Sequence, residues 1–166
     1  GDWLHFEEHV KYFDAFCFNA ERTVALALSE KRGQEVSLFL PYYGQMKKNE
    51  AIRTEKLMDF TVRLSWRKQY CGLYRVKSKK KKLKVYLIDN EYYFAREGKI
   101  YGHYDDGERF AFFSKACLDA ISALNINPDI VNCNDWQTAP AIIYLKGMYY
   151  GDYKFKKIKT VFTIHN

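Results

Sequence analysis

Two short groups of polar residues near the end of the chain could do chemistry together. The first is Asn134-Asp135-Trp136 and the second is His165-Asn166. Between them they offer a carboxylate, an imidazole, two side-chain amides and an indole ring, which supply hydrogen-bond donors, acceptors and one flat apolar surface. Such a set suits a polyhydroxylated ligand, provided that the fold brings the two groups to one place.

The elements around these residues predict that the fold brings the two polar groups together. The run Ile130 to Cys133 has the composition of a short buried strand, and a helix is expected from about Gln137 to Lys146, with Pro140 tolerated in its first turn. The β-branched run Ile158 to Ile164 predicts a second strand. Strand, helix and strand form a βαβ unit with parallel strands and a right-handed crossover. The carboxyl ends of parallel strands share one edge, where ligands bind in open α/β folds.

Upstream, several further elements are expected. Glu35 to Leu40 predicts a strand closed by Pro41, residues 47–56 a polar loop, and Phe60 to Trp66 a half-exposed strand of period two. Tyr70 to Val76 and Leu83 to Ile88 predict an antiparallel hairpin with lysines at its tip.

The last upstream elements are a tyrosine-rich loop after residue 89 and a long helix. Asp105 to Glu108 should open that helix because acidic residues favour a helix N-terminus. The expected buried face of the helix consists of Phe110, Phe113, Cys117, Ile121 and Leu124. Near the N-terminus, residues 13–18 have strand character, and a helix beginning at Asn19 should end at Gly33.

Composition narrows the class of protein. A chain of 166 residues, 48% of them hydrophobic, is long enough for one domain with a real core. No apolar run approaches the length of a bilayer span, and Gly1-Asp2-Trp3 has neither a basic region nor an apolar signal core, so neither a membrane partner nor secretion is expected. The four cysteines are widely spaced, which favours packed thiols in a reducing cytoplasm over disulfides or a metal site.

The net charge of +7 raises the question of a nucleic-acid partner. Five of the positive charges are Lys77 and Lys79 to Lys82, and without them the balance is only +2. A single lysine cluster at a turn is typical of a solvated loop, and it also discourages edge-to-edge strand pairing. Nucleic-acid binding is therefore ranked last among the functions considered, and no nucleic-acid partner is expected.

Several blocks of sequence, in the same order and with similar spacing, resemble bacterial glycogen synthase and plant starch synthase. The resemblance covers roughly residues 22–166. The blocks that carry it are Glu35 to Gly44, Ile88 to Phe94, Tyr104 to Phe110, Cys133 to Trp136 and Val161 to Asn166. A set of blocks in register is much more specific than any single motif.

The resemblance implies a retaining glucosyltransferase that moves glucose from ADP-glucose to the end of an α-1,4-glucan without a metal or other cofactor. It implies a GT-B architecture of two Rossmann-like domains, of which residues 1–166 are a single, truncated N-terminal domain: an open α/β sheet, mainly parallel, with an antiparallel hairpin extension. The C-terminal domain is absent, so the chain alone should be inactive. Its partners would be ADP-glucose, the α-glucan and the missing domain, in the cytoplasm of a bacterium or the plastid of a plant.

The resemblance also implies roles for individual residues. Asp135 matches the family's cleft aspartate and His165 the histidine that contacts the donor sugar, so these two are the candidate catalytic residues. Tyr101, in the tyrosine-rich loop, and Asn166, beside the histidine, are the candidate substrate-binding residues. Trp136 is expected in the core or behind the site, and no metal ligands are expected.

One departure from the family concerns the N-terminus. The family's Lys-Thr-Gly-Gly-Leu loop, which meets the donor phosphates, has no counterpart in residues 1–21. An ungapped alignment puts Asp14 in the lysine's place and Phe16-Cys17 where the glycines belong, and Asp14 would repel a phosphate. A second alignment deletes the loop and makes residues 13–18 the first strand. An alternative function is therefore a non-catalytic module that binds glucan on its tyrosine-rich rim.

Overall fold

The computed structural model describes residues 25, 29–30, 34–79 and 81–165. The chain divides into two compact units, Gly1–Phe60 with Gly72–Ile100, and Thr61–Cys71 with Tyr101–Asn166. The strand expected at residues 13–18 and the helix expected after Asn19 lie outside the described residues. The expectation of a single domain over residues 1–166 stays a prediction.

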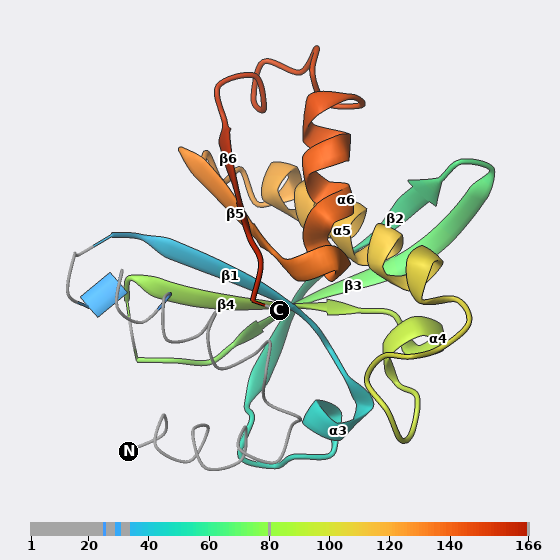
Figure 1. The fold of residues 1–166 in the computed structure, drawn as a ribbon. Helices are drawn as coiled ribbons and strands as arrows, with labels where there is room; N and C mark the ends of the chain where they lie inside the picture. Colours follow the sequence, from blue (N-terminus) through green and yellow to red (C-terminus); the bar gives the residue numbers. More distant parts are fainter. Residues whose placement is uncertain (1–24, 26–28, 31–33, 80, 166) are drawn as a thin grey trace. The chain divides into compact units, whose positions relative to one another are not determined.

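The first unit is built on a four-stranded sheet of order β1-β4-β3-β2. Strand β1 (Val36–Pro41) runs parallel to β4 (Leu83–Asp89), and β4 pairs antiparallel with β3 (Arg67–Val76). Strand β2 (Thr54–Leu64) is the outermost, and β2 and β3 both continue into the second unit. Figure 1 shows β1 and β4 side by side.

Strand β4 forms the centre of this sheet. All of its residues except Lys84 are buried, as expected for a strand covered on both faces. The ring of Tyr86 on β4 stacks on that of Phe39 on β1, with centroids 5.0 Å apart. Two one-turn helices, α3 (Gly44–Lys47) and α4 (Glu91–Phe94), follow β1 and β4. Both helices therefore begin where the parallel strands end.

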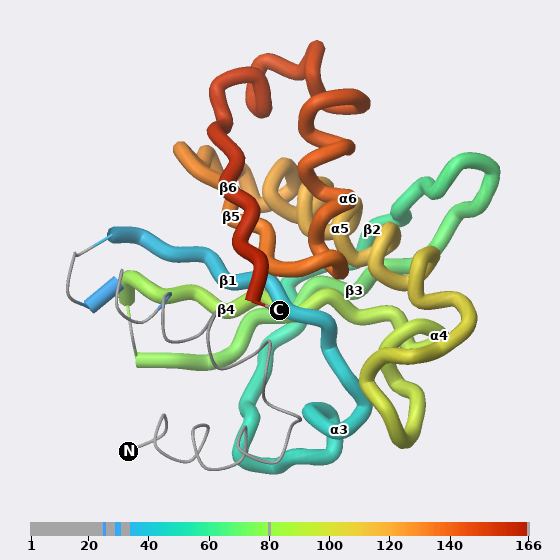
Figure 2. Tube along the Cα trace, viewed as in Figure 1, coloured from blue at the N-terminus to red at the C-terminus, as the bar shows by residue number. Residues whose placement is uncertain are grey.

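The second unit contains the predicted βαβ motif. Strand β5 (Ile130–Asn134), helix α6 (Asp135–Lys146) and strand β6 (Lys159–Thr163) follow one another, and β5 and β6 pair in parallel from Ile130↔Lys159 to Asn134↔Thr163. Helix α5 (Asp106–Ala123) packs against α6, where the Ser114 hydroxyl donates to the Gln137 carbonyl over 3.4 Å. Figure 2 shows the backbones of β5 and β6 next to each other. The expected α/β class with parallel strands is confirmed.

Helix α5 largely follows its predicted pattern. Phe110, Phe113 and Ile121 are buried, whereas Cys117 and Leu124 are only half-buried. The helix ends at Asn125, whose φ of 53° is left-handed, and the Ile126 amide donates back to the Ile121 carbonyl over 3.0 Å. This six-to-one bond is the Schellman arrangement that satisfies carbonyls at a helix end.

Two predictions of irregular structure are wrong. Strand β2 already begins at Thr54, inside the segment expected to be loop, because its residues pair with β3. Residues 91–94 form helix α4 instead of starting a tyrosine-rich loop, because the Asn90 side chain accepts a hydrogen bond from the Tyr93 amide over 3.1 Å and caps the turn.

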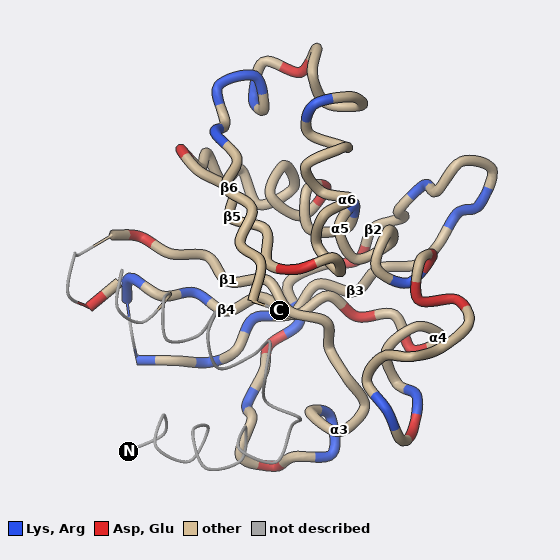
Figure 3. The backbone as a smooth tube through the Cα atoms, in the orientation of Figure 1, with Lys and Arg blue, Asp and Glu red and all other residues tan. Residues whose placement is uncertain are grey.

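The hairpin with a basic tip is confirmed in the described residues. The lysines at positions 77, 79, 81 and 82 are exposed between β3 and β4, and Figure 3 shows the basic segments at this turn. Cys71, Cys117 and Cys133 are free thiols, as expected. Among the described residues, no helix combines the length and the apolar character that crossing a membrane requires.

Candidate functional site

The two polar groups meet at one rim of the second unit. The His165 amide, two residues beyond β6, donates to Asp135 Oδ1 over 2.8 Å. The His165 ring lies against Asn134, with Nε2 and Oδ1 3.1 Å apart. We call Asn134, Asp135 and His165 the β5–β6 rim. Residues about thirty positions apart are thus joined as the parallel pairing predicted.

The backbone at Asp135 explains the direction of its carboxylate. Asn134 is extended, with φ of −112° and ψ of 126°, whereas Asp135 has a φ of 55°. Aspartate is one of the few residue types other than glycine that adopt this left-handed conformation. The chain therefore turns sharply between β5 and α6. No side chain caps α6 by a hydrogen bond at Asn134, and the Asp135 carboxylate holds the end of β6 instead.

Neighbouring side chains fix the strand ends that carry the rim. The Thr138 hydroxyl donates to the Asn134 carbonyl over 2.6 Å, and the Thr163 hydroxyl donates to Asn132 Oδ1, on the partner strand, over 3.0 Å. Cys133 is buried, and burial raises the pKa of its thiol to about 11 although a hydrogen bond with Thr138 lowers it. The Cys133 thiol is therefore protonated at neutral pH and unsuited to nucleophilic chemistry.

Trp136 was expected in the core or behind the site, and the structure excludes the first of these two placements. It is half-exposed, and one edge of the indole packs against the Phe110 ring with centroids 5.2 Å apart and planes at 82°. The exposed part of the indole is therefore a flat aromatic surface in the first turn of α6, one residue after Asp135.

Tyr101 is half-exposed in the loop before α5 and makes no hydrogen bond or ring contact with another described residue. The loop is held by Asp106, whose Oδ2 accepts the amides of Gly102 (2.5 Å) and His103 (3.1 Å). Asp106 also pairs with the fully buried Arg109. Sequence reasoning assigned Asp106 to helix capping and missed these contacts with the loop and with Arg109. The signal in the sequence was the i, i+3 spacing of Asp106 and Arg109. The structure does not join Tyr101 to His165, and Asn166 lies outside the described residues.

A second polar rim, which sequence reasoning missed, lies at the carboxyl ends of β1 and β4 in the first unit. Lys47 Nζ is 2.8 Å from Oδ1 of the buried Asp89 and 3.2 Å from Glu91 Oε1. Burial lowers the pKa of Lys47, but its hydrogen bonds and ion pairs with Asp89 and Glu91 outweigh burial and raise that pKa above its ordinary value. We call Lys47, Asp89 and Glu91 the β1–β4 rim. Among the described residues, no three His, Cys, Asp or Glu side chains are grouped as a metal site.

Comparison with known proteins places the chain in a family. The family model for the starch synthase catalytic domain matches residues 22–166. The glycogen synthase of Exiguobacterium sibiricum is 47% identical over 146 residues, which are 87% of this chain and 30% of that protein. The glycogen synthase of Bacillus subtilis is 45% identical over 134 residues, 81% of this chain and 27% of that protein.

A solved structure shares the fold. The catalytic domain of starch synthase IV from Arabidopsis thaliana, bound to ADP and acarbose, superposes with a TM-score of 0.75 at 24% identity, over 92% of this chain and 30% of that one. The α/β arrangement thus matches the N-terminal domain of the GT-B fold. The chain spans about 30% of the length of the curated relatives it matches. It belongs to the starch synthase catalytic domain family, of which it carries one part.

Proposed function

We propose that this chain forms the N-terminal part of a retaining glucosyltransferase that moves glucose from ADP-glucose to an α-1,4-glucan. The observation that carries the proposal is the contact between Asp135 and His165, which unites the family's Asp-Trp and His-Asn motifs at one rim. Relatives named glycogen synthase and a structural neighbour bound to ADP and acarbose support the donor and the glucan as substrates.

His165 supplies the group that meets the sugar. Its Nε2 faces Asn134 Oδ1, an oxygen that can only accept, so Nε2 is the donor of this pair and Nδ1 is left to contact a sugar hydroxyl. An imidazole fixed in this way before the donor binds needs no reorganisation when positive charge develops on the glucosyl ring. The half-exposed Tyr101 and the neighbouring Asn166 complete the sugar site in this proposal.

Asp135 acts through His165. Its side chain is only 5% exposed, and its Oδ1 accepts the His165 main-chain amide. The carboxylate therefore fixes the backbone from which the imidazole projects. We propose that the reaction needs no metal or cofactor. The bacterial relatives favour a bacterial cytoplasm over a plastid.

A chimera tests this function with a complete enzyme. Residues 22–166 replace the matching segment of the Exiguobacterium sibiricum glycogen synthase, which supplies the remaining parts of the enzyme that this chain lacks. We expect the chimera to incorporate glucose from ADP-glucose into glycogen, and His165→Ala to lower kcat about 100-fold, as loss of a preorganised electrostatic contact does.

Lys81→Ala, at the exposed turn between β3 and β4, is the matched control and should leave kcat unchanged. A folded chimera without transfer activity, or a His165→Ala chimera within twofold of its parent, would contradict the proposal.

The isolated chain should show no turnover in the same assay. If it binds glycogen in a manner that Tyr101→Ala abolishes while the chimera stays inactive, the binding-module alternative is favoured.

A further inference from the structure

The position of Tyr101 depends on the backbone of its loop. Its side chain is 48% exposed and makes no hydrogen bond or ring contact with another described residue. Gly102 follows with a φ of 90°, a conformation that favours glycine. Beyond its chain neighbours, no atom lies within 4 Å of the place that a Cβ on Gly102 would take. The backbone conformation, and not lack of space, therefore calls for glycine in residues 101–103, which we name the Tyr101 loop.

Asp106 ties the Tyr101 loop to the start of α5. Its Oδ2 accepts the amides of Gly102 over 2.5 Å and of His103 over 3.1 Å, and its own main-chain amide donates to the His103 carbonyl over 3.1 Å. Hydrogen bonds to a carboxylate are about twice as strong as those between neutral groups. Both amides precede α5, so the carboxylate organises the loop instead of capping the helix.

Arg109 holds Asp106 in turn. The Arg109 side chain is 1% exposed and pairs with Oδ1 of Asp106. Its guanidinium carbon lies 5.4 Å from the ring centroid of Phe110, within the range of a cation–π contact, and the Phe110 ring packs against the edge of Trp136. A continuous set of contacts thus leads from the Tyr101 loop to the residue that follows Asp135.

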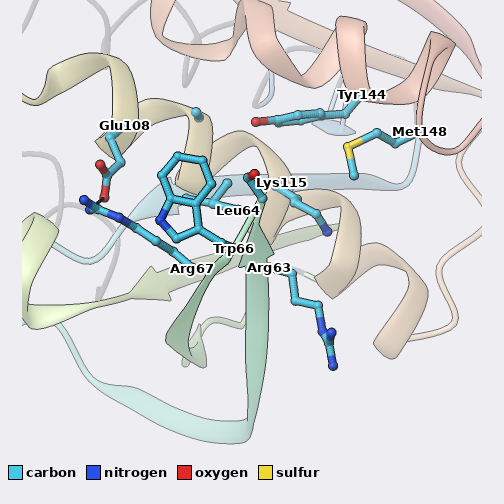
Figure 4. Close-up of a pocket in the computed structure, with 10 residues that line it drawn as sticks. Arg63, Leu64, Trp66, Arg67, Glu108, Lys115, Tyr144 and Met148 are labelled. Carbon is cyan, nitrogen blue, oxygen red and sulfur yellow. Dashed lines mark hydrogen bonds and ion pairs between the residues drawn. The ribbon is translucent and has the colours of Figure 1, made fainter.

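The other acidic residue in the first turn of α5 faces a different neighbour. Glu108 Oε1 is 2.6 Å from Nη1 of Arg67, at the start of β3, and Figure 4 shows these two side chains together. Glu108 and Asp106 lie in the same turn and interact with the same helix dipole. A difference between their variants therefore reports the loop contacts of Asp106, which makes Glu108 the matched control.

We propose that Asp106, held by Arg109, is a positioning residue for glucosyl transfer, which orients Tyr101 before the sugar binds. The inference rests on the proposed function, in which Tyr101 belongs to the sugar site. Asp106 itself does not contact the sugar. A loop that is ordered beforehand loses less freedom when the sugar binds, and a displaced binding group stabilises the transition state less. The loss of Asp106 should therefore act through Tyr101.

The first test is a double-mutant cycle on kcat/KM for ADP-glucose in the chimera. We expect Asp106→Asn to lower kcat/KM about tenfold while Tyr101 is present, and less than twofold in the Tyr101→Ala background. Gly102→Ala disturbs the same loop without removing the pair of Asp106 and Arg109, and it should give the same pattern. Glu108→Gln should stay within twofold of its parent in both backgrounds.

Hydrogen exchange in the 166-residue chain tests the loop contacts without any turnover. The amides of Gly102 and His103 should exchange about tenfold faster in Asp106→Asn than in the parent, each measured relative to the amide of the buried Ala116 in the same helix. Glu108→Gln should leave both ratios unchanged.

Two results overturn the inference. One is an Asp106→Asn loss of the same factor with and without Tyr101, as general destabilisation would give, and the other is loop amides whose exchange Asp106→Asn leaves unchanged. In an active chimera, either result refutes the positioning role alone. An inactive parent chimera whose loop amides depend on Asp106 refutes the glucosyltransferase proposal instead.

Discussion

The two rims of the molecule each contain a buried aspartate at the carboxyl end of a parallel strand. Asp89 ends β4 and is 4% exposed, and Asp135 follows β5 and is 5% exposed. These contacts of the two carboxylates differ in kind: Asp89 lies 2.8 Å from the Lys47 ammonium, whereas Asp135 accepts the His165 main-chain amide over 2.8 Å.

The kind of partner indicates the role of each carboxylate. A side-chain cation needs the negative charge of its partner, so the β1–β4 rim fastens α3 to the end of the sheet by an ion pair. A main-chain amide needs only an acceptor oxygen in the right place, so the β5–β6 rim fixes the position of a residue. We interpret the first rim as structural and the second as the functional one.

The largest expected effect is at the β1–β4 rim. Lys47→Met leaves the buried Asp89 carboxylate without its cation and should lower the free energy of unfolding by about 3 kcal/mol. Urea denaturation monitored by circular dichroism measures it. Lys48→Met is the control, because Lys48 pairs with Glu97 in solvent, where such a pair is worth less than about 1 kcal/mol. Equal losses for the two variants would remove the distinction between the rims.

The second-largest effect comes from substitutions of the two buried aspartates, Asp135 and Asp89. Asp135→Ala should cost about 2 kcal/mol, since a hydrogen bond to a charged group is lost and alanine tolerates the left-handed φ poorly. Asp135→Asn keeps an acceptor oxygen and tolerates that φ, so its cost should stay below about 1 kcal/mol. Asp89→Asn should cost more than Asp135→Asn because it removes the charge that faces Lys47. The reverse order in urea denaturation would show that our assignment of the rims is wrong.

The pH dependence of stability should also differ between the rims. The pKa of Lys47 is raised from 10.5 in the folded protein, so its ion pairs stabilise fully below pH 10.5 and are lost as pH rises through the raised pKa. The urea midpoint of the parent chain should therefore fall more steeply above pH 10.5 than that of Lys47→Met. Parallel curves for the two proteins would mean that Lys47 contributes no linked stability.

The smallest effect compares two left-handed residues. Ser65 and Asp135 have φ of 54° and 55°. Ser65→Gly should relieve strain and stabilise the chain by about 0.5 kcal/mol after the entropic cost of glycine, whereas Asp135→Gly should destabilise it because the bond to His165 is lost. Thermal unfolding of both variants measures the sign of each change, and a destabilised Ser65→Gly would argue against strain at the hairpin turn.

Much of the β5–β6 rim could be predicted from the sequence. Two β-branched runs flanking a helical segment imply parallel strands, and parallel strands share an end, so His165 and Asp135 were expected to meet. The contact itself was not specified, because the left-handed φ of Asp135 and its bond to a main-chain amide leave no periodic signal. The distribution of the described strands over two sheets was likewise not foreseen.

The β1–β4 rim shows why other features escaped prediction. Lys47 and Asp89 are far apart in the sequence, and Lys47 stood in a segment expected to be loop. Helix α4 depends on a single capping side chain, Asn90. The sequence pattern of its tyrosines predicts a helix only weakly. Contacts made by tertiary packing alone leave no local signal in the sequence, whereas strands and helices are visible there through their periodicity.

The most direct test of the central claim is a double-mutant cycle on kcat in the chimera, with Asp135→Ala and His165→Ala made singly and together. Asp135 acts by fixing the backbone of residue 165, so its loss should matter only while the imidazole is present. We predict that the double variant loses no more activity than His165→Ala alone. Losses that multiply, as for two independent groups, would contradict the claim that the two residues work as one unit.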